Sequence, residues 1–299
     1  MDYTTKYLLG YTIMKTLSKT FLRCALFGSL LPFIVVNAQS ISSSKNKYAN
    51  IPPQSEQAKL VDYVSDFPYD LYTVCTVENQ EKFYIDDPQD SIKYWLTQGQ
   101  AWEPYIVDLL KHYIKPDSCV VDAGAHIGTH TIVMAHSVGK NGRVVAFEPQ
   151  LKIYRELVMN ARLNNCPNID CYRCAIGNEH KTIEMNKSVA GFEGGTGIGA
   201  GGDIVEMHPL DSFNLQNVSL MKVDVEGSED AFLDGATNTI LQNRPIIIIE
   251  IQGGWDYDTA PQNIRDNITR TKDKLDALNY TVKKVSPHDY LAIPMNLSR

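Results

Sequence analysis

From residue 119 onward, short apolar runs alternate with segments that have helical periodicity. This alternation is typical of consecutive βαβ units, and therefore of a mostly parallel sheet with helices on both faces. The run at residues 245–250 is apolar up to its last residue, Glu250, as expected for a strand that is covered on both faces. The sequence therefore predicts a Rossmann-like, doubly wound α/β domain over residues 119–299.

The same patterns locate the individual elements and their order. After residue 278 we expect two strands, at residues 279–285 and 291–294, that close the sheet as an antiparallel terminal pair. The other expected strands lie at residues 119–122, 144–147, 169–172, 220–224 and 245–250, and the expected helices at residues 128–138, 151–164, 228–233 and 261–278.

Residues 59–118 form a smaller N-terminal cap in this interpretation. Residues 71–77 and 82–85 are rich in β-branched and aromatic side chains, which predicts a hairpin. Residues 102–114 have apolar side chains at helical spacing, and the sequence Lys115-Pro116-Asp117 is expected to end that helix.

The first 38 residues have the composition of a targeting segment. Basic residues follow Met14, an apolar stretch covers residues 24–36, and Ala38 offers a small residue for cleavage. This layout predicts a signal peptide and a secretory route, with a secreted or luminal product. The alternative is a membrane anchor at residues 21–38, although the apolar stretch is shorter than the roughly 20 residues that a spanning helix needs. Residues 39–58 are expected to form a polar linker.

The charge balance restricts the partners of the chain. The formal net charge is -7 and the isoelectric point is about 5.5. Phosphate backbones are bound mainly by Lys and Arg patches, so we expect no nucleic-acid partner. A small-molecule or glycan acceptor is expected instead, with membrane contact only through the N-terminal segment if it serves as an anchor.

The sharpest local motif runs from Val120 to Gly128, where an expected strand leads through a glycine-containing turn into a helix. Gly124 allows the chain to turn and approach a ligand, and Gly128 allows the helix to begin near the strand. Glu148 stands at the end of the next expected strand, where a carboxylate can accept hydrogen bonds from ribose hydroxyls. Together with Asp122, these residues predict a site for an adenosyl cofactor.

The turn differs from the other common nucleotide loops. It has neither the Gly-x-Gly-x-x-Gly spacing of nicotinamide enzymes nor the Gly-Lys-Ser/Thr of phosphate loops. A nicotinamide oxidoreductase is therefore disfavoured. The acidic side chain of Asp122, on the strand side of the glycines, suits a cationic or amino-bearing ligand better than a pyrophosphate.

The motifs between Gly99 and Gly253 resemble the FkbM-type methyltransferases, which use S-adenosylmethionine (SAM) and commonly methylate hydroxyls of sugars and other secondary metabolites. The motifs that carry the resemblance are Trp102-Glu103-Pro104, the loop from Asp122 to His130, Ala146-Phe147-Glu148-Pro149, the helix end with Asn160 and Asn164, Ala175-Ile176-Gly177, Leu210-Asp211, the segment from Lys222 to Glu229, and Glu250.

This resemblance implies a class I methyltransferase fold with SAM as cofactor. It implies SAM contacts for Asp122, Gly124, Gly128 and Glu148, with Ala175 and Ile176 near the adenine. His126 occupies the position of the middle glycine of the general methyltransferase loop, which looks normal for this family. We also assign His126 and Pro149 to the cofactor site.

The end of the fourth expected strand, Lys222-Val-Asp-Val-Glu-Gly227, supplies the candidate catalytic residues. Strand alternation is expected to place Lys222, Asp224 and Glu226 on one side. Asp224 or Glu226 would accept the proton of the acceptor hydroxyl, and Lys222 would hold or polarise its oxygen. Two alternatives are a structural ion pair and a divalent metal shared by Asp224 and Glu250; we predict no metal.

Residues 190–202 contain seven glycines, which disfavours a helix or the interior of a strand. We interpret this segment as a lid or acceptor loop, or alternatively as a loop that is merely flexible. Phe192, Glu193 and Glu250 are the predicted acceptor contacts. The function expected from the whole sequence is a SAM-dependent O-methyltransferase acting on a hydroxyl of a sugar or other small metabolite; the alternative is a catalytically inactive secreted binding module on the same fold.

Overall fold

The structure is a computed structural model that describes residues 66–251 and 260–295. The predicted targeting segment at residues 1–38 and the linker at residues 39–58 lie outside the described residues. The chain divides into two units at residues 47 and 48, and every described residue belongs to the second. Among the described residues, no helix combines the length and apolar character needed to cross a membrane.

A seven-stranded sheet organises the described part of the chain. Five consecutive strands of the sheet are parallel to one another, and the terminal pair adds in antiparallel orientation, as the sequence predicted. The sheet consists, in spatial order, of β5 (Ile169–Tyr172), β4 (Arg143–Phe147), β3 (Cys119–Ala123), β9 (Val218–Val223), β10 (Ile246–Glu250), β12 (Asp289–Pro294) and β11 (Tyr280–Lys284).

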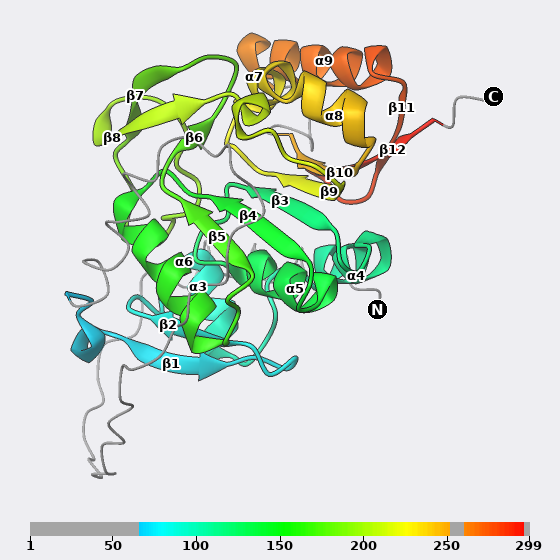
Figure 1. Cartoon of the computed structure of the whole chain (residues 1–299). Helices are drawn as coiled ribbons and strands as arrows, with labels where there is room; N and C mark the ends of the chain where they lie inside the picture. The colour runs from blue at the N-terminus through cyan, green and yellow to red at the C-terminus, as the bar shows by residue number, and fades with distance from the viewer. Residues whose placement is uncertain (1–65, 252–259, 296–299) are drawn as a thin grey trace, which may run out of the picture. The chain divides into compact units, whose positions relative to one another are not determined.

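Helices cover both faces of this sheet, which confirms the predicted doubly wound α/β fold (Figure 1). One apolar cluster joins one face of the sheet to the helices α7 and α9, and a second joins the other face to α4 and α5. The helices have the bounds α4 (Pro104–Tyr113), α5 (Thr129–Val138), α6 (Leu151–Leu163), α7 (Glu229–Gly235), α8 (Thr237–Asn243) and α9 (Gln262–Ala277).

The structure contains several elements that the sequence patterns did not reveal. Three of them form a separate sheet in the order β6-β8-β7, and two are the short helices α3 and α8. β6, α3 and α8 are brief, and β7 and β8 bury only alternate side chains where they pair, so the local pattern is weak without the partner strand. Their bounds are β6 (Ala175–Ile176), β7 (Lys181–Asn186), β8 (Gly201–His208) and α3 (Ser91–Thr97).

The glycine-rich segment leads into this second sheet. Residues 190–200 contain no helix and no named strand, but Gly201 and Gly202 begin β8. A Cβ atom on Gly202 would lie 2.3 Å from the carbonyl oxygen of Asn186. Glycine here therefore permits the close approach of two backbones at the strand end.

The predicted N-terminal hairpin is present as β1 (Thr73–Thr76) and β2 (Lys82–Ile85), and side-chain amides on α6 attach it to the main domain. The fully buried Asn160 accepts a hydrogen bond from the Tyr84 N–H at 2.8 Å and donates one to the Ile127 carbonyl at 2.9 Å. Asn164 exchanges two hydrogen bonds with the backbone of Lys82. Asn160 therefore links the hairpin, α6 and the loop after β3.

Replacing Asn160 with alanine should lower the free energy of unfolding by about 2 to 4 kcal/mol, because it leaves a buried donor and a buried acceptor without partners. The matched control Asn164→Ala removes hydrogen bonds at a more exposed site and should reduce it by about 1 kcal/mol. Urea denaturation of both variants measures the difference. Equal losses would contradict a linking role for Asn160.

Candidate active site

The candidate site lies where the chain changes direction across the sheet, between the carboxyl ends of β3 and β9. The loop after β3 leads to α5 and the loop after β9 leads to α7, on opposite faces; such switch points form ligand crevices in open α/β sheets. Gly124 has a φ of +82°, and a Cβ atom there would lie 1.7 Å from the carbonyl oxygen of Asp224. The glycine is required by this contact between the two loops.

Asp122 is fully buried on β3, beside its register partner Lys222 on β9. Its Oδ2 accepts a hydrogen bond from the Thr131 hydroxyl at 2.6 Å, whereas its Oδ1 has no hydrogen-bond partner. Burial raises the pKa of this carboxyl, opposed by the positive charge of Lys222. A buried acceptor that lacks a donor is costly unless a ligand supplies one, so Oδ1 marks a ligand position.

Glu148 directly follows β4 and is 4% exposed. Its two carboxylate oxygens accept hydrogen bonds from the backbone N–H groups of His126, at 3.0 Å, and Gln150, at 2.9 Å. These bonds fix the carboxylate against the β3–α5 loop, and each oxygen retains a further lone pair for a ligand hydroxyl. Burial raises the pKa of Glu148 to about 8.

The remaining predicted cofactor residues lie in the loop after β3, directly after Glu148, and in β6. His126 has a φ of +49°, and neither of its ring nitrogens has a hydrogen-bond partner; burial lowers its pKa to about 4. Gly128 precedes α5 with a φ of +93° and packs against Leu157. Pro149 is half-buried and directly follows Glu148, and Ala175 and Ile176 form β6 further along the chain.

Lys222 and Asp224 form an ion pair at the end of β9, with 3.0 Å between Nζ and Oδ2. Burial alone would lower the pKa of Lys222, but the charges of Asp224 and Asp122 outweigh it and raise the pKa. β9 ends at Val223, and Glu226 lies in the following loop with a φ of +50°. The expectation that strand alternation aligns Glu226 with the other two was therefore wrong, because the strand ends first; its catalytic role stays a prediction.

Two further acids join Glu250 at this edge, and sequence reasoning assigned neither to the site. Asp289 is the register partner of Glu250 on the neighbouring strand, and it accepts a hydrogen bond from the Tyr105 hydroxyl at 2.8 Å. The same hydroxyl lies 3.1 Å from Glu103 Oε1, just before α4. The signal for Glu103 was its place in the Trp-Glu-Pro motif; Asp289 had no local signal.

Sheet geometry explains why these acids converge. The second apolar cluster contains Val120, Leu220, Ile248 and Leu291. Side chains two residues apart on a strand share a face. The next side chains on this face, nearer the carboxyl edge of the parallel strands, are therefore those of Asp122, Lys222, Glu250 and Asp289.

These buried acids strongly perturb one another. The charge of Asp224, followed by burial, raises the pKa of Glu250 to about 10. Burial and then Asp289 raise the pKa of Glu103 to about 8. Lys222 opposes both shifts, so one ammonium group is shared among several carboxyl groups.

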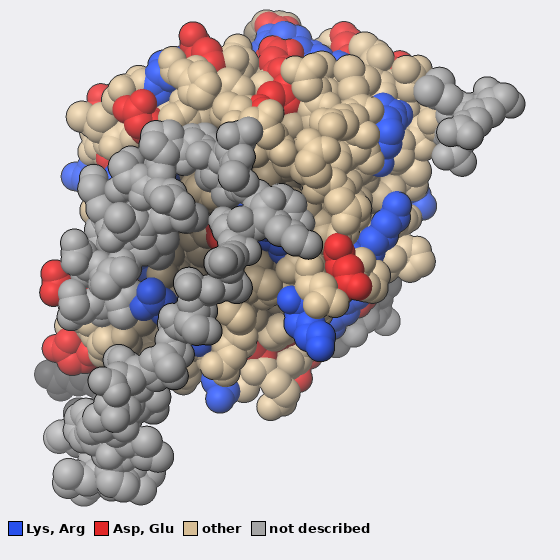
Figure 2. All heavy atoms as spheres, in the orientation of Figure 1, with Lys and Arg blue, Asp and Glu red and all other residues tan. Residues whose placement is uncertain are grey.

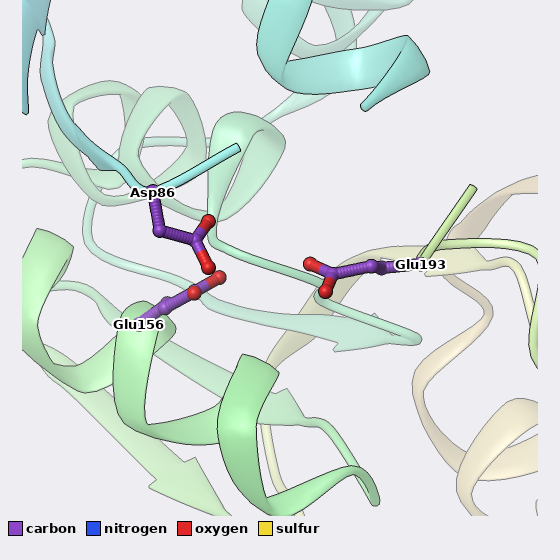
Figure 3. Close-up of side chains that lie close together, drawn as sticks. All are labelled: Asp86, Glu156 and Glu193. Carbon is purple, nitrogen blue, oxygen red and sulfur yellow. The ribbon is translucent and has the colours of Figure 1, made fainter. Parts of the chain in front are cut away.

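A second charged cluster holds the glycine-rich segment against the cap (Figure 3). The carboxylates of Asp86, Glu156 and Glu193 lie within 4.8 Å of one another, close enough to share a metal ion. Lys93, which is fully buried, bonds to all three, and Lys152 pairs with all three as well. Two ammonium groups therefore already supply the positive charge.

These ion pairs occupy the carboxylate of Glu193, one of the predicted acceptor contacts. The segment around it lies near the cofactor loop, since a Cβ atom on Gly194 would be 3.5 Å from His126 Nε2. Phe192, by contrast, is 55% exposed. A cavity of about 680 Å³ lies beside the cluster, lined by Glu193, Lys152 and Arg155 among others. Acceptor roles for Phe192 and Glu193 stay predictions.

The surface of the described residues carries both signs of charge. On the face drawn in Figure 2, Lys and Arg side chains are scattered among acidic and uncharged residues. The expectation that no nucleic acid binds stays a prediction.

Comparison with known proteins assigns the chain to a family. Residues 122–280, just over half of the chain, match the Methyltransferase FkbM domain. The chain belongs to the FkbM methyltransferase family. This confirms the resemblance found in the sequence. Residues 58–178 also match the protein-L-isoaspartate(D-aspartate) O-methyltransferase domain.

Individual relatives of this FkbM chain are distant. Methyltransferase 1 of Beauveria bassiana is 27% identical over 178 residues, which cover 48% of this chain and 69% of that protein. The hexuronic acid methyltransferase AglP of Haloferax volcanii is 26% identical over 168 residues, covering 54% and 67%. A crystal structure of a methyltransferase FkbM from Methylobacillus flagellatus is 19% identical, with a TM-score of 0.45, covering 67% of this chain and 52% of that one. This FkbM chain thus spans about half the length of that bacterial protein.

The raised pKa of Glu103 should make the stability of this chain depend on pH. Between its ordinary value of 4.5 and about 8, the unfolded chain loses this proton and the folded chain keeps it, so stability falls as pH rises. In Glu103→Gln, the free energy of unfolding should fall less steeply with pH, by up to about 1.4 kcal/mol per pH unit. Urea denaturation from pH 4.5 to 8 compares the two proteins. Parallel stability curves would show that Glu103 is not perturbed.

Proposed function

We propose that this chain is a SAM-dependent O-methyltransferase that transfers a methyl group to a hydroxyl of a sugar or other small metabolite. The observation that carries the proposal is the buried carboxylate of Asp122, whose Oδ1 lacks a donor at the switch point of the sheet. Membership of the FkbM methyltransferase family supports the same reaction class.

The donor set of the site fits SAM. Asp122 offers a carboxylate oxygen to an amino group, and Glu148 offers the remaining lone pairs of a carboxylate that the backbone already orients. Once bound, SAM supplies an electrophilic methyl group on a cationic sulfonium. The surrounding acidic groups favour a cationic ligand on electrostatic grounds.

The residues at the end of β9 are suited to bind and deprotonate an acceptor hydroxyl. Asp224 accepts the hydroxyl proton in this proposal, and the Lys222 ammonium group stabilises the negative charge that develops on the oxygen. The raised pKa of Lys222 keeps it cationic and excludes it as the base. Glu250 is protonated at neutral pH, since its pKa is raised to about 10, which favours Asp224 over Glu250 in this role.

Isothermal titration of the full chain with SAM tests the cofactor. We expect binding by the wild type and at least tenfold weaker binding by Asp122→Asn and by Glu148→Gln, since each loses a hydrogen bond to a charged group. Asp108→Asn, on the exposed side of α4, is a matched control and should bind like the wild type. A folded wild type that gives no heat, or variants that bind normally, would refute the proposal.

We infer in addition that residues 1–38 direct the chain to the secretory route, with cleavage after Ala38. The basic residues, the apolar stretch and the small residue at the boundary support this inference. Their alternative role is a retained membrane anchor at residues 21–38.

N-terminal sequencing of the protein from its native source distinguishes the two. We expect a mature chain that begins at Gln39. A chain that retains residues 21–38 and sediments with membranes would establish the anchor instead.

A further inference from the structure

The edge of the sheet beside the cofactor loop holds far more acidic than basic groups. Glu103, Asp224, Glu250 and Asp289 come from four separate elements, and the charge of Lys222 acts on each of them and on Asp122. The side chain of Lys222 is 6% exposed and that of Asp224 is 26% exposed. Water therefore screens these charges incompletely.

A second observation indicates that this acidic edge, which we call the acceptor edge (Glu103, Asp224, Glu250 and Asp289), is a ligand site. His130 is 5% exposed, and its Nε2 has no hydrogen-bond partner. This nitrogen lies 3.8 Å from Glu103 Oε2, too far for a hydrogen bond. A buried polar atom directed at the edge without a partner is expected where a ligand completes the bonding.

The cofactor accounts for only part of the acidic excess. SAM carries a sulfonium, an ammonium and a carboxylate, so its net charge is +1. Asp122 faces the amino group of SAM in the proposed function, which leaves Glu103, Asp224, Glu250 and Asp289 with Lys222 alone. Neighbouring negative charge and burial already disfavour ionisation of Glu103 and Glu250, and the same environment disfavours a negative charge on whatever binds next to SAM.

A metal ion is not the occupant that this arrangement favours. Among residues 66–251 and 260–295, the three carboxylates close enough to share an ion are Asp86, Glu156 and Glu193, in the other cluster. The carboxylates of the acceptor edge are spread more widely, which suits an organic group with several polar atoms.

We propose that the acceptor edge selects its substrate by charge: it binds neutral and amino-bearing sugars and rejects uronic acids and other anionic acceptors. The inference rests on the proposed function of the same site. An anionic acceptor would lose its hydration shell beside like charges, which is a strong basis for exclusion. Hydroxyl and ammonium groups instead donate hydrogen bonds to the carboxylates. The proposal separates this chain from the relative named a hexuronic acid methyltransferase.

The raised pKa values of Glu103 and Glu250 agree with this selectivity. Without a ligand, the edge lowers its charge by holding protons. A cationic acceptor would take over that neutralising role, whereas an anionic acceptor would require still more protons.

A matched set of acceptors tests the proposal with the full chain at pH 7. The methyl glycosides of glucose, glucosamine and glucuronic acid differ in charge on a similar ring. Two readouts are used: methyl transfer from radiolabelled SAM, and binding to the S-adenosylhomocysteine complex by saturation-transfer NMR. We expect the glucoside and the glucosaminide to exceed the glucuronide at least tenfold in one or both. Equal signals for all three, or preference for the glucuronide, would overturn the proposal.

A variant of the edge assigns the selectivity to a named residue. At pH 9, above the pKa of about 8 of Glu103, Glu103→Gln removes one negative charge and should reduce the preference against the glucuronide about tenfold. Asp108→Asn removes an exposed acid from α4 and should leave the preference unchanged. Titration with SAM verifies that each variant is folded. An unchanged preference in Glu103→Gln at this pH would overturn the assignment to this edge.

Failure of the selectivity proposal is distinguishable from failure of the proposed function. If the proposed function is wrong, SAM does not bind, even before any acceptor is added. If only the selectivity proposal is wrong, the protein binds SAM but uses all three acceptors equally or prefers the anionic one.

Discussion

The site depends on the register between β3 and β9. This register sets the Asp122 carboxylate beside Lys222, and it brings the loop at Gly124 onto the carbonyl oxygen of Asp224. A shift of one residue would turn the charged pair toward the opposite, apolar face. The apolar side chains below the pair hold the register, because each strand is buried on both sides. The same strand register therefore sets both the packing of the core and the positions of the charged side chains.

The buried carboxylates differ in the groups that stabilise them. Thr131 and the backbone N–H groups of His126 and Gln150 fix the two carboxylates assigned to the cofactor. Glu103 and Glu250 at the acceptor edge share the charge of Lys222 with the other acids, and their pKa values are raised. A site built in this way stores unfavourable electrostatic energy that a suitably charged ligand can relieve.

Segments outside the central sheet are fixed next to this site by buried polar contacts. Asn160 attaches the hairpin and the loop after β3 to α6, and Glu193 attaches the glycine-rich segment to Lys93 in the cap. Buried ion pairs contribute little net stability, since desolvation offsets their attraction. Their effect here is to specify where an otherwise adaptable glycine-rich segment lies, which is next to the ring of His126.

The sequence by itself determined the chain order of the seven strands of the central sheet and of the longer helices, the glycine turn with Asp122, and the placement of Glu148 and Lys222 at strand ends. These features are local, because hydrophobic periodicity and turn chemistry are properties of a few consecutive residues. Only the tertiary structure decided that Glu103 and Asp289 join Glu250, that Glu226 leaves the strand, and that Glu193 pairs with Lys93. Those outcomes depend on strand register and on contacts between residues far apart in the chain, and the shared charge of Lys222 exists only once four elements meet at one edge of the sheet.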